Sequence, residues 1–248
     1  MLSYIPIIIS GWLMGILVNY LADVLPIKRS LSKPLCDTCG SPFPLVNYFS
    51  WRRRCPSCGK IRSFRTWFIE IFFVITSTLL WVYPSIKLGF IPGLLLLGYF
   101  AVIAIIDFEH RIILHPVVVF GIFLCGGGGV RLHGILRTLE GGLTGFGLML
   151  LLYYLGILVV RMRLIKRVDL TEREAIGFGD VNLSGVLGLI LGWPAILVGL
   201  FLTILSAGLV SFFYIMLMLA KHRYNPNLAI PYGPFLILGA VILLYLRF

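Results

Sequence analysis

Long apolar stretches recur along almost the whole chain and are separated by short polar segments. We count eight, and most reach the roughly 17–25 residues that an α-helix needs to cross a bilayer. The sixth is short, so we expect a broken or re-entrant helix there unless residues 175–180 extend it. The pattern predicts an all-α polytopic membrane protein. Its expected spans are residues 5–22, 67–83, 90–106, 112–130, 141–160, 181–192, 195–220 and 228–246.

Composition supports the same fold class. Hydrophobic residues make up 59% of the chain and charged residues only 12%, against roughly 25% charged in ordinary soluble domains. The opening "MLSY" has no basic residue, so we expect the first stretch to be a span and not a cleavable signal peptide. The four consecutive glycines at 126–129 are interpreted as a flexible helix end.

The net charge of +11 comes from basic residues that are unevenly placed. Most of the 21 lysines and arginines lie in alternate loops, at residues 23–66, 111, 161–176 and 221–227. By the positive-inside rule these loops face the cytoplasm, and both termini lie outside. The positive charge is then explained by orientation and by anionic lipid headgroups, and we expect no nucleic-acid partner.

Two aspartates are expected at the cytoplasmic ends of different helices. The third span runs inward and ends at "AVIAIIDFEHR", which contains Asp107, whereas the sixth runs outward and begins at "GFGD", which contains Asp180. The two acids are therefore predicted at one membrane depth, facing the same compartment. Acids at such positions are functional candidates.

Two neighbouring carboxyl groups share a proton and can divide the roles of acid and base, as in aspartic proteases. Gly177 and Gly179 would allow unusual backbone dihedrals and the close approach of an extended peptide. Two other interpretations remain open. Each aspartate can be a helix-end or capping residue, or the pair can form the proton relay of an ion-coupled transporter. Transporters usually carry inverted repeats, and the sequence shows none.

The first cytoplasmic loop contains four cysteines in two CxxC pairs, Cys36 with Cys39 and Cys55 with Cys58. Fifteen residues separate the pairs, a spacing typical of structural tetrahedral zinc sites. Two disulfides are the alternative, but thiols stay reduced in the cytoplasm. We therefore predict a small zinc module between the first and second spans.

Several segments in order resemble one family, the bacterial prepilin peptidases that remove the leader of type IV pilins and methylate the product. "GWLMGILVNYLADVLP" is similar to the first span of that family. "IIDFEHRIIL" resembles its first catalytic motif and "GFGDVNL" its second, of GxGD type. The cysteine-containing domain is matched by "PIKRSLSKPLCDTCG", "FSWRRRCPSCGKI" and "FRTWFIE", and the closing signature by "PYGPFLILGA".

This resemblance implies a multi-pass enzyme of the bacterial cytoplasmic membrane whose substrates are prepilins or pseudopilins. Asp107 and Asp180 would be the catalytic pair, and S-adenosylmethionine the methyl donor. Glu70 and the cysteine module would serve the methyltransferase, giving domains at 1–22 (first span), 23–66 (zinc loop) and 67–248 (peptidase). Two alternatives remain open for this family resemblance. The chain can be a peptidase without methyltransferase activity, or its cysteine module can dock pilus or secretion machinery.

The chain departs from the family pattern at two places. The family usually has a lysine two residues after the second aspartate, where this chain has Asn182. It also often has a Pro-Asp pair shortly after the first aspartate, where Leu114 and His115 stand here. Asn182 in place of a lysine removes a cation that could lower the pKa of a neighbouring carboxyl group, so we expect a changed pH optimum. The aspartate pair itself is intact.

Overall fold

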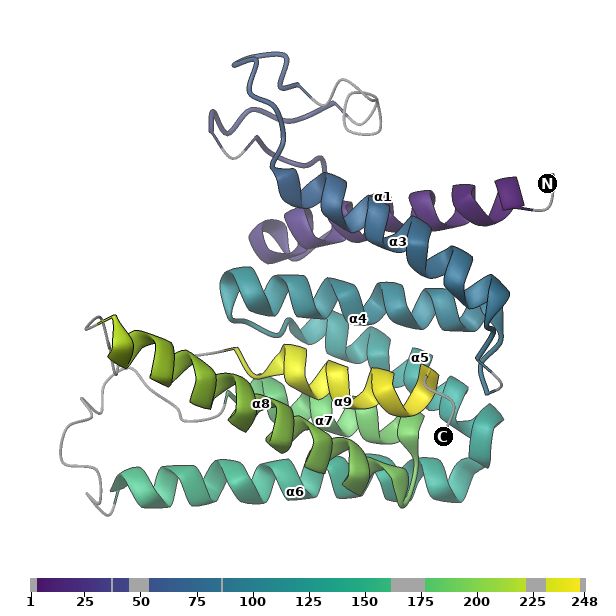
Figure 1. The fold of residues 1–248 in the computed structure, drawn as a ribbon, viewed down its shortest axis with the longest axis vertical. Helices are drawn as coiled ribbons and strands as arrows, with labels where there is room; N and C mark the ends of the chain where they lie inside the picture. The colour runs from purple at the N-terminus through teal and green to yellow at the C-terminus, as the bar shows by residue number, and fades with distance from the viewer. Residues whose placement is uncertain are drawn as a thin grey trace. The chain divides into compact units, whose positions relative to one another are not determined.

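The computed structural model describes residues 4–36, 38–44, 54–85, 87–161, 177–221 and 231–245. Within these ranges the regular structure is α-helical, apart from two isolated backbone bridges, and the all-α prediction is confirmed there. The helices are α1 (Ile5–Lys28), α3 (Phe64–Val82), α4 (Phe90–His110), α5 (His115–His133), α6 (Ile135–Arg161), α7 (Phe178–Leu191), α8 (Ala195–Ala220) and α9 (Gly233–Tyr245) (Figure 1).

Six of the described helices are long and apolar enough to cross a membrane, in agreement with a multi-pass protein. The other two, α7 and α9, have 14 and 13 residues. At 1.5 Å per residue they are about 20 Å long, less than the roughly 30 Å of the hydrocarbon core. The sixth stretch forms one continuous short helix that begins at Phe178, so residues 178–180 extend it and the expected break is not found within it. Two parts of the predicted pattern lie outside the described ranges. They are residues 228–230 and 246 of the expected eighth span, and the loop segment 162–176 with its lysines and arginines.

The chain divides into two compact units, residues 1–106 and 107–248. In the first unit α1 packs along α3. Gly11 and Gly15 of α1 leave room for this contact, because a Cβ at Gly15 would lie 2.7 Å from the Cα of Glu70. Small residues at such crossings let helix backbones approach closely, as is common between membrane helices.

The second unit is built around α7, which packs against α5, α6, α8 and α9 (Figure 1). Most of its side chains are buried, and Val181 and Leu183 have no exposed surface. A helix surrounded by other helices can be shorter than the bilayer is thick, because its ends need not meet lipid.

Glycines make the closest helix contacts in this unit. A Cβ at Gly188 of α7 would lie 2.2 Å from the carbonyl oxygen of Gly141 in α6. A Cβ at Gly129 of α5 would lie 2.0 Å from the carbonyl oxygen of Leu189. The interpretation of the glycine run as a flexible helix end was therefore wrong, because Gly129 lies inside α5 and packs on α7.

We expect Gly188→Ala to destabilise the second unit by about 1–3 kcal/mol, the usual cost of overpacking a close contact. The measurement is thermal unfolding of the purified protein in detergent. Gly147→Ala in α6 is the matched control, because a Cβ there meets nothing within 4 Å. Equal unfolding temperatures for the two variants would contradict the α6–α7 contact.

Candidate functional site

Asp107 lies in the last turn of α4, which continues beyond the expected end of the third span. The helix ends there because Arg111 adopts a left-handed conformation, with φ of 56°, and its N–H donates to the carbonyl oxygen of Asp107 at 2.8 Å. A left-handed residue just past the last turn is a common helix terminator. The Asp107 side chain is only 5% exposed.

Asp180 lies in the first turn of α7, at the third helical position after the N-cap residue Gly177. Its backbone N–H donates to the carbonyl oxygen of Gly177 at 3.0 Å. Asp180 is therefore not itself the N-cap, and its side chain is buried, with 9% exposed. A carboxyl group in the first turn of a helix is favoured by the helix dipole.

The second unit brings the two acids together. They are close enough that the charge of Asp107 acts directly on Asp180. The start of α9 joins them, because the backbone N–H of Gly233 donates to Oδ2 of Asp107 at 3.0 Å. The charge of Asp180 also acts on Tyr232, the residue before Gly233. The result is a buried acid pair assembled from the ends of three helices.

The glycines near this pair have different physical roles. Gly177 has φ of −70°, so the unusual dihedral expected there is not found. Gly179 permits close packing, since a Cβ there would lie 2.8 Å from the Cβ of Ile113. Gly233 makes the closest contact of the three glycines, because a Cβ there would lie 2.6 Å from Oδ2 of Asp107. No role was predicted for Gly233 from the sequence, although it lies within the "PYGPFLILGA" segment that resembles the closing signature of the family.

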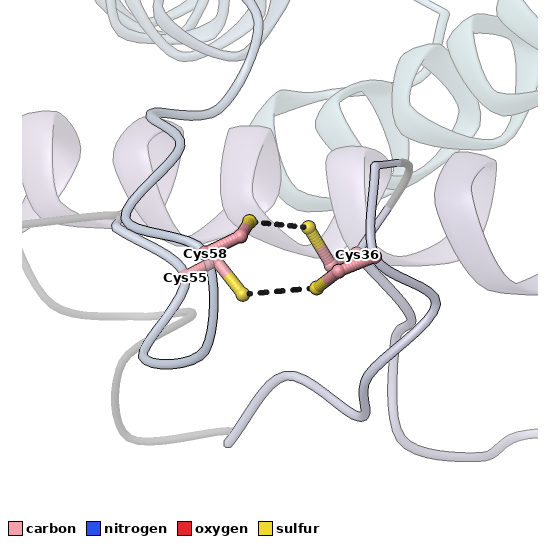
Figure 2. A group of neighbouring side chains, drawn as sticks. Cys36, Cys55 and Cys58 are labelled. Carbon is pink, nitrogen blue, oxygen red and sulfur yellow. Dashed lines mark hydrogen bonds between the residues drawn. The ribbon is translucent and has the colours of Figure 1, made fainter.

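The four cysteines of the first unit form one cluster, with all Sγ atoms within 4.8 Å of one another. Cys36 lies 3.7 Å from Cys58, and Cys39 lies 3.6 Å from Cys55, sulfur to sulfur. Figure 2 shows the sulfurs of the two CxxC pairs facing each other across a small gap. The cluster is located in the loop between α1 and α3, as the spacing predicted.

These distances fit a tetrahedral metal site. A zinc–sulfur bond of roughly 2.3 Å places tetrahedral sulfurs about 3.8 Å apart. A disulfide would require about 2.05 Å, and all four cysteines are free thiols. The residues present can therefore hold one metal ion with four sulfur ligands.

The two halves of the cluster have the same local geometry. Cys36 and Cys55 each accept, at the backbone oxygen, an N–H from a glycine four residues on, at 2.9 Å in both cases. These glycines, Gly40 and Gly59, have φ of 66° and 70°, a region that L-residues with side chains rarely adopt. The glycine after each second cysteine thus forms the turn that points both sulfurs the same way.

Ser41 forms hydrogen bonds with two of the cysteine sulfurs and favours the thiolate form of Cys55. Its hydroxyl lies 2.9 Å from the Cys39 sulfur and 3.6 Å from that of Cys55. Hydrogen bonds from the Ser41 side chain and then the Cys58 backbone lower the pKa of the Cys55 thiol to about 6. At Cys58 the Lys60 backbone lowers the pKa, but burial and the other sulfurs raise it to about 12. A bound metal displaces such a proton, so its affinity falls in acid.

We expect Cys36→Ser to release the metal from the purified protein, because a hydroxyl is a poor substitute for a thiolate ligand. Elemental analysis should give about one zinc per wild-type chain and far less in the variant. Cys125→Ala is the matched control, since Cys125 is buried in α5 outside the cluster. Full zinc content in Cys36→Ser would contradict the four-sulfur site.

Glu70 belongs to the first unit and lies on the face of α3 that contacts α1. It is 4% exposed, and Nε1 of Trp12 donates to its Oε2 at 3.0 Å. Two further polar contacts lie between Glu70 and the cysteine loop. The side chain of Asn19 in α1 donates to the carbonyl oxygen of Thr66 at 3.1 Å. Closer to the loop, Asp23 of α1 forms ion pairs with Arg62 and Arg65. Glu70 is therefore one member of a row of polar contacts between two apolar helices, which continues beyond it to Ser77, whose hydroxyl donates to the carbonyl oxygen of Ile7 at 3.1 Å.

By fold and site, the protein is a polytopic membrane protein with a buried acid pair and, in the loop between α1 and α3, four cysteines that could hold a metal ion. Known proteins give a more specific assignment. The type IV leader peptidase family matches residues 94–212. A relative from Pseudomonas aeruginosa, named prepilin leader peptidase/N-methyltransferase, is 30% identical over 229 residues, covering 87% of this chain and 72% of the relative. The chain belongs to this family.

Two further relatives carry the same name. The protein from Myxococcus xanthus is 27% identical over 88% of this chain and 64% of its own length. The protein from Aeromonas hydrophila is 27% identical over 90% of this chain and 75% of its own length. The chain thus spans about two thirds to three quarters of these curated relatives. No solved structure matches the chain.

Proposed function

We propose that this protein removes the leader of type IV prepilins or pseudopilins by aspartate-dependent hydrolysis and then methylates the new N-terminus. The observation that carries the proposal is the buried pair of Asp107 and Asp180, held together at the ends of α4, α7 and α9. The names of its relatives agree with both activities.

In the proposed hydrolysis the pair holds one proton between its two carboxyl groups. We assign the role of base to Asp107, because its Oδ2 already accepts the Gly233 N–H, a hydrogen bond that stabilises a carboxylate. Asp107 then accepts a proton from water, and the water oxygen forms a bond to the scissile carbonyl carbon. Asp180 donates its proton to that carbonyl oxygen, which gives a tetrahedral diol. The C–N bond then breaks as Asp107 passes the proton taken from water to the leaving amine, and a diol hydroxyl returns a proton to Asp180.

We place this chemistry at the cytoplasmic face of the bacterial inner membrane, with both termini outside. The basic loops support that orientation. A prepilin with its apolar helix in the bilayer would then present its leader to the acid pair. Gly177, in an extended conformation at the start of α7, offers space beside the Asp180 carboxyl for an unwound peptide. Partners beyond the substrate would be pilus or secretion machinery.

For the methyltransferase half, we assign the four-cysteine cluster to a structural zinc ion and the methyl donor to S-adenosylmethionine. When bound, the donor would supply the methyl group of its sulfonium. The amine nitrogen would form a bond to that methyl carbon, and the sulfur would leave with the S–C electron pair. The zinc would hold together a loop whose small buried apolar cluster, among its described residues, consists of Phe43 and Cys55. Glu70 would support this half by fixing α1 against α3.

The proposal is tested by incubating the purified protein with a prepilin, with and without S-adenosylmethionine, and reading the product by mass spectrometry. We expect loss of the leader in both reactions and the mass of one added methyl group only with the donor. Leader loss without methylation would support the peptidase activity and contradict the methyltransferase activity. Failure to cleave would overturn the proposed function.

A further inference from the structure

Tyr232 directly precedes α9 in the second unit and lies beside the acid pair. Its neighbour Gly233 donates its backbone N–H to Oδ2 of Asp107 at 3.0 Å. The charge of Asp180 acts on Tyr232 itself. One short segment therefore binds the first acid through its backbone and brings a phenol side chain within electrostatic reach of the second.

The backbone of Tyr232 is held in place by the helices around it. Its carbonyl oxygen accepts the N–H groups of Phe235 at 3.1 Å and Leu236 at 3.3 Å, in the first turn of α9. The α9 helix packs along α7, which carries Asp180 in its own first turn (Figure 1). A donor on such an anchored backbone is positioned before the reaction begins, which is what makes a donor effective in catalysis.

The hydroxyl of Tyr232 has no hydrogen-bond partner among the described residues. The side chain is half-buried. Tyrosine hydroxyls usually find a hydrogen-bond partner where the ring is buried. A phenol is protonated at neutral pH, so its O–H can donate. The second unit thus holds a hydrogen-bond donor next to its two acids that no described protein group uses.

We propose that the Tyr232 hydroxyl donates a hydrogen bond to the scissile carbonyl oxygen, an inference that rests on the proposed hydrolysis. In that reaction Asp180 donates a proton to the same oxygen, so a group close to Asp180 is close to this oxygen. Negative charge develops there as water bonds to the carbonyl carbon, and a positioned O–H stabilises it. The phenol keeps its proton, so the proton transfers of the two aspartates are unchanged. Tyr232 is then a third catalytic residue.

A structural role for the same residue makes a different prediction. Tyrosine rings are common where membrane proteins meet the bilayer surface, and there the amphipathic ring is what matters. Tyr154 of α6 is 60% exposed and provides a comparison within the same unit. A catalytic hydroxyl affects the rate of the chemical step, whereas an interfacial ring affects folding and stability.

The experiment measures kcat and KM for prepilin cleavage by the purified protein in nanodiscs. It also measures inhibition by a prepilin peptide whose scissile amide is replaced by a hydroxyethylene group, which mimics the tetrahedral diol. Tyr232→Phe removes only the hydroxyl, and Tyr232→Leu also removes the ring. Tyr154→Phe is the matched control, because it makes the same chemical change at an exposed side chain. Unfolding temperatures report whether each variant keeps its fold.

We expect Tyr232→Phe to lower kcat by about 10–10²-fold, with KM and the unfolding temperature close to the wild-type values. One preorganised donor is worth roughly 10²–10³-fold, and a half-buried donor shared with water is worth less. The inhibitor should bind more weakly by a similar factor, because the hydrogen bond is strongest in the tetrahedral state. Tyr232→Leu should lose about as much kcat as Tyr232→Phe, and Tyr154→Phe should lose none.

Wild-type kcat and inhibitor affinity in Tyr232→Phe would overturn the inference and leave hydrolysis by the acid pair standing. A loss confined to Tyr232→Leu would assign the effect to the ring and would also overturn it, as would an equal loss in Tyr154→Phe. If Tyr232→Phe unfolds more readily, titration with the inhibitor counts its active sites, and kcat per active site decides. Absence of cleavage by the wild type would overturn the proposed function and this inference with it.

Discussion

Asp107→Asn and Asp180→Asn are each expected to reduce leader cleavage by about 10³-fold or more. General acid–base catalysis contributes roughly 10²–10⁴-fold, and neither member of the pair can take over the role of the other. The amide has nearly the shape of the carboxyl group, so the fold should survive. The measurement is the rate of leader loss from a prepilin in detergent under single-turnover conditions.

The matched control is Glu109→Gln, the same chemical change two residues along α4 at an exposed side chain. It should leave cleavage at the wild-type rate. Methylation of a synthetic, already cleaved pilin should persist in both aspartate variants, which separates loss of chemistry from loss of folding. Wild-type cleavage by either aspartate variant would exclude the proposed mechanism. Proton flux in liposomes that is abolished by Asp107→Asn would instead favour an ion relay.

The sequence predicted the helices well because the protein is built from long apolar stretches. The expected seventh span, 195–220, has the same bounds as α8 (Ala195–Ala220). The cysteine spacing likewise predicted a cluster, because two CxxC pairs have few ways to fold other than around a metal. The pairing of Asp107 with Asp180 followed from counting spans, which places both acids at one depth.

The packing between helices could not be predicted in the same way. These helices are apolar on nearly every side, so periodicity does not show which face meets a neighbour. The contacts of Gly188 with Gly141, and of Gly129 with Leu189, depend on the tertiary arrangement alone. The bond from Gly233 to Asp107 joins residues 126 positions apart, which no local pattern indicates. The polar contacts along α1 and α3 were missed for the same reason.

Gly233→Ala is expected to reduce leader cleavage by about 10²-fold without unfolding the protein. A Cβ at this position would lie 2.6 Å from Oδ2 of Asp107, so the carboxyl group must move from its place beside Asp180. Displacement of a catalytic group by about 1 Å can cost 10²-fold in rate. Gly233 is the first residue of α9, and alanine is a better helix former than glycine, so the helix itself is not weakened. The measurement is kcat and KM for prepilin cleavage.

Because Gly233 would act by positioning Asp107, its replacement should lower kcat while KM stays close to the wild-type value. A purely structural role would lower both the unfolding temperature and the amount of active enzyme, without that separation. Gly208→Ala in α8 is the matched control, because a Cβ there meets nothing within 4 Å. Unchanged kcat in Gly233→Ala would show that the start of α9 does not hold the acid pair in its reactive geometry.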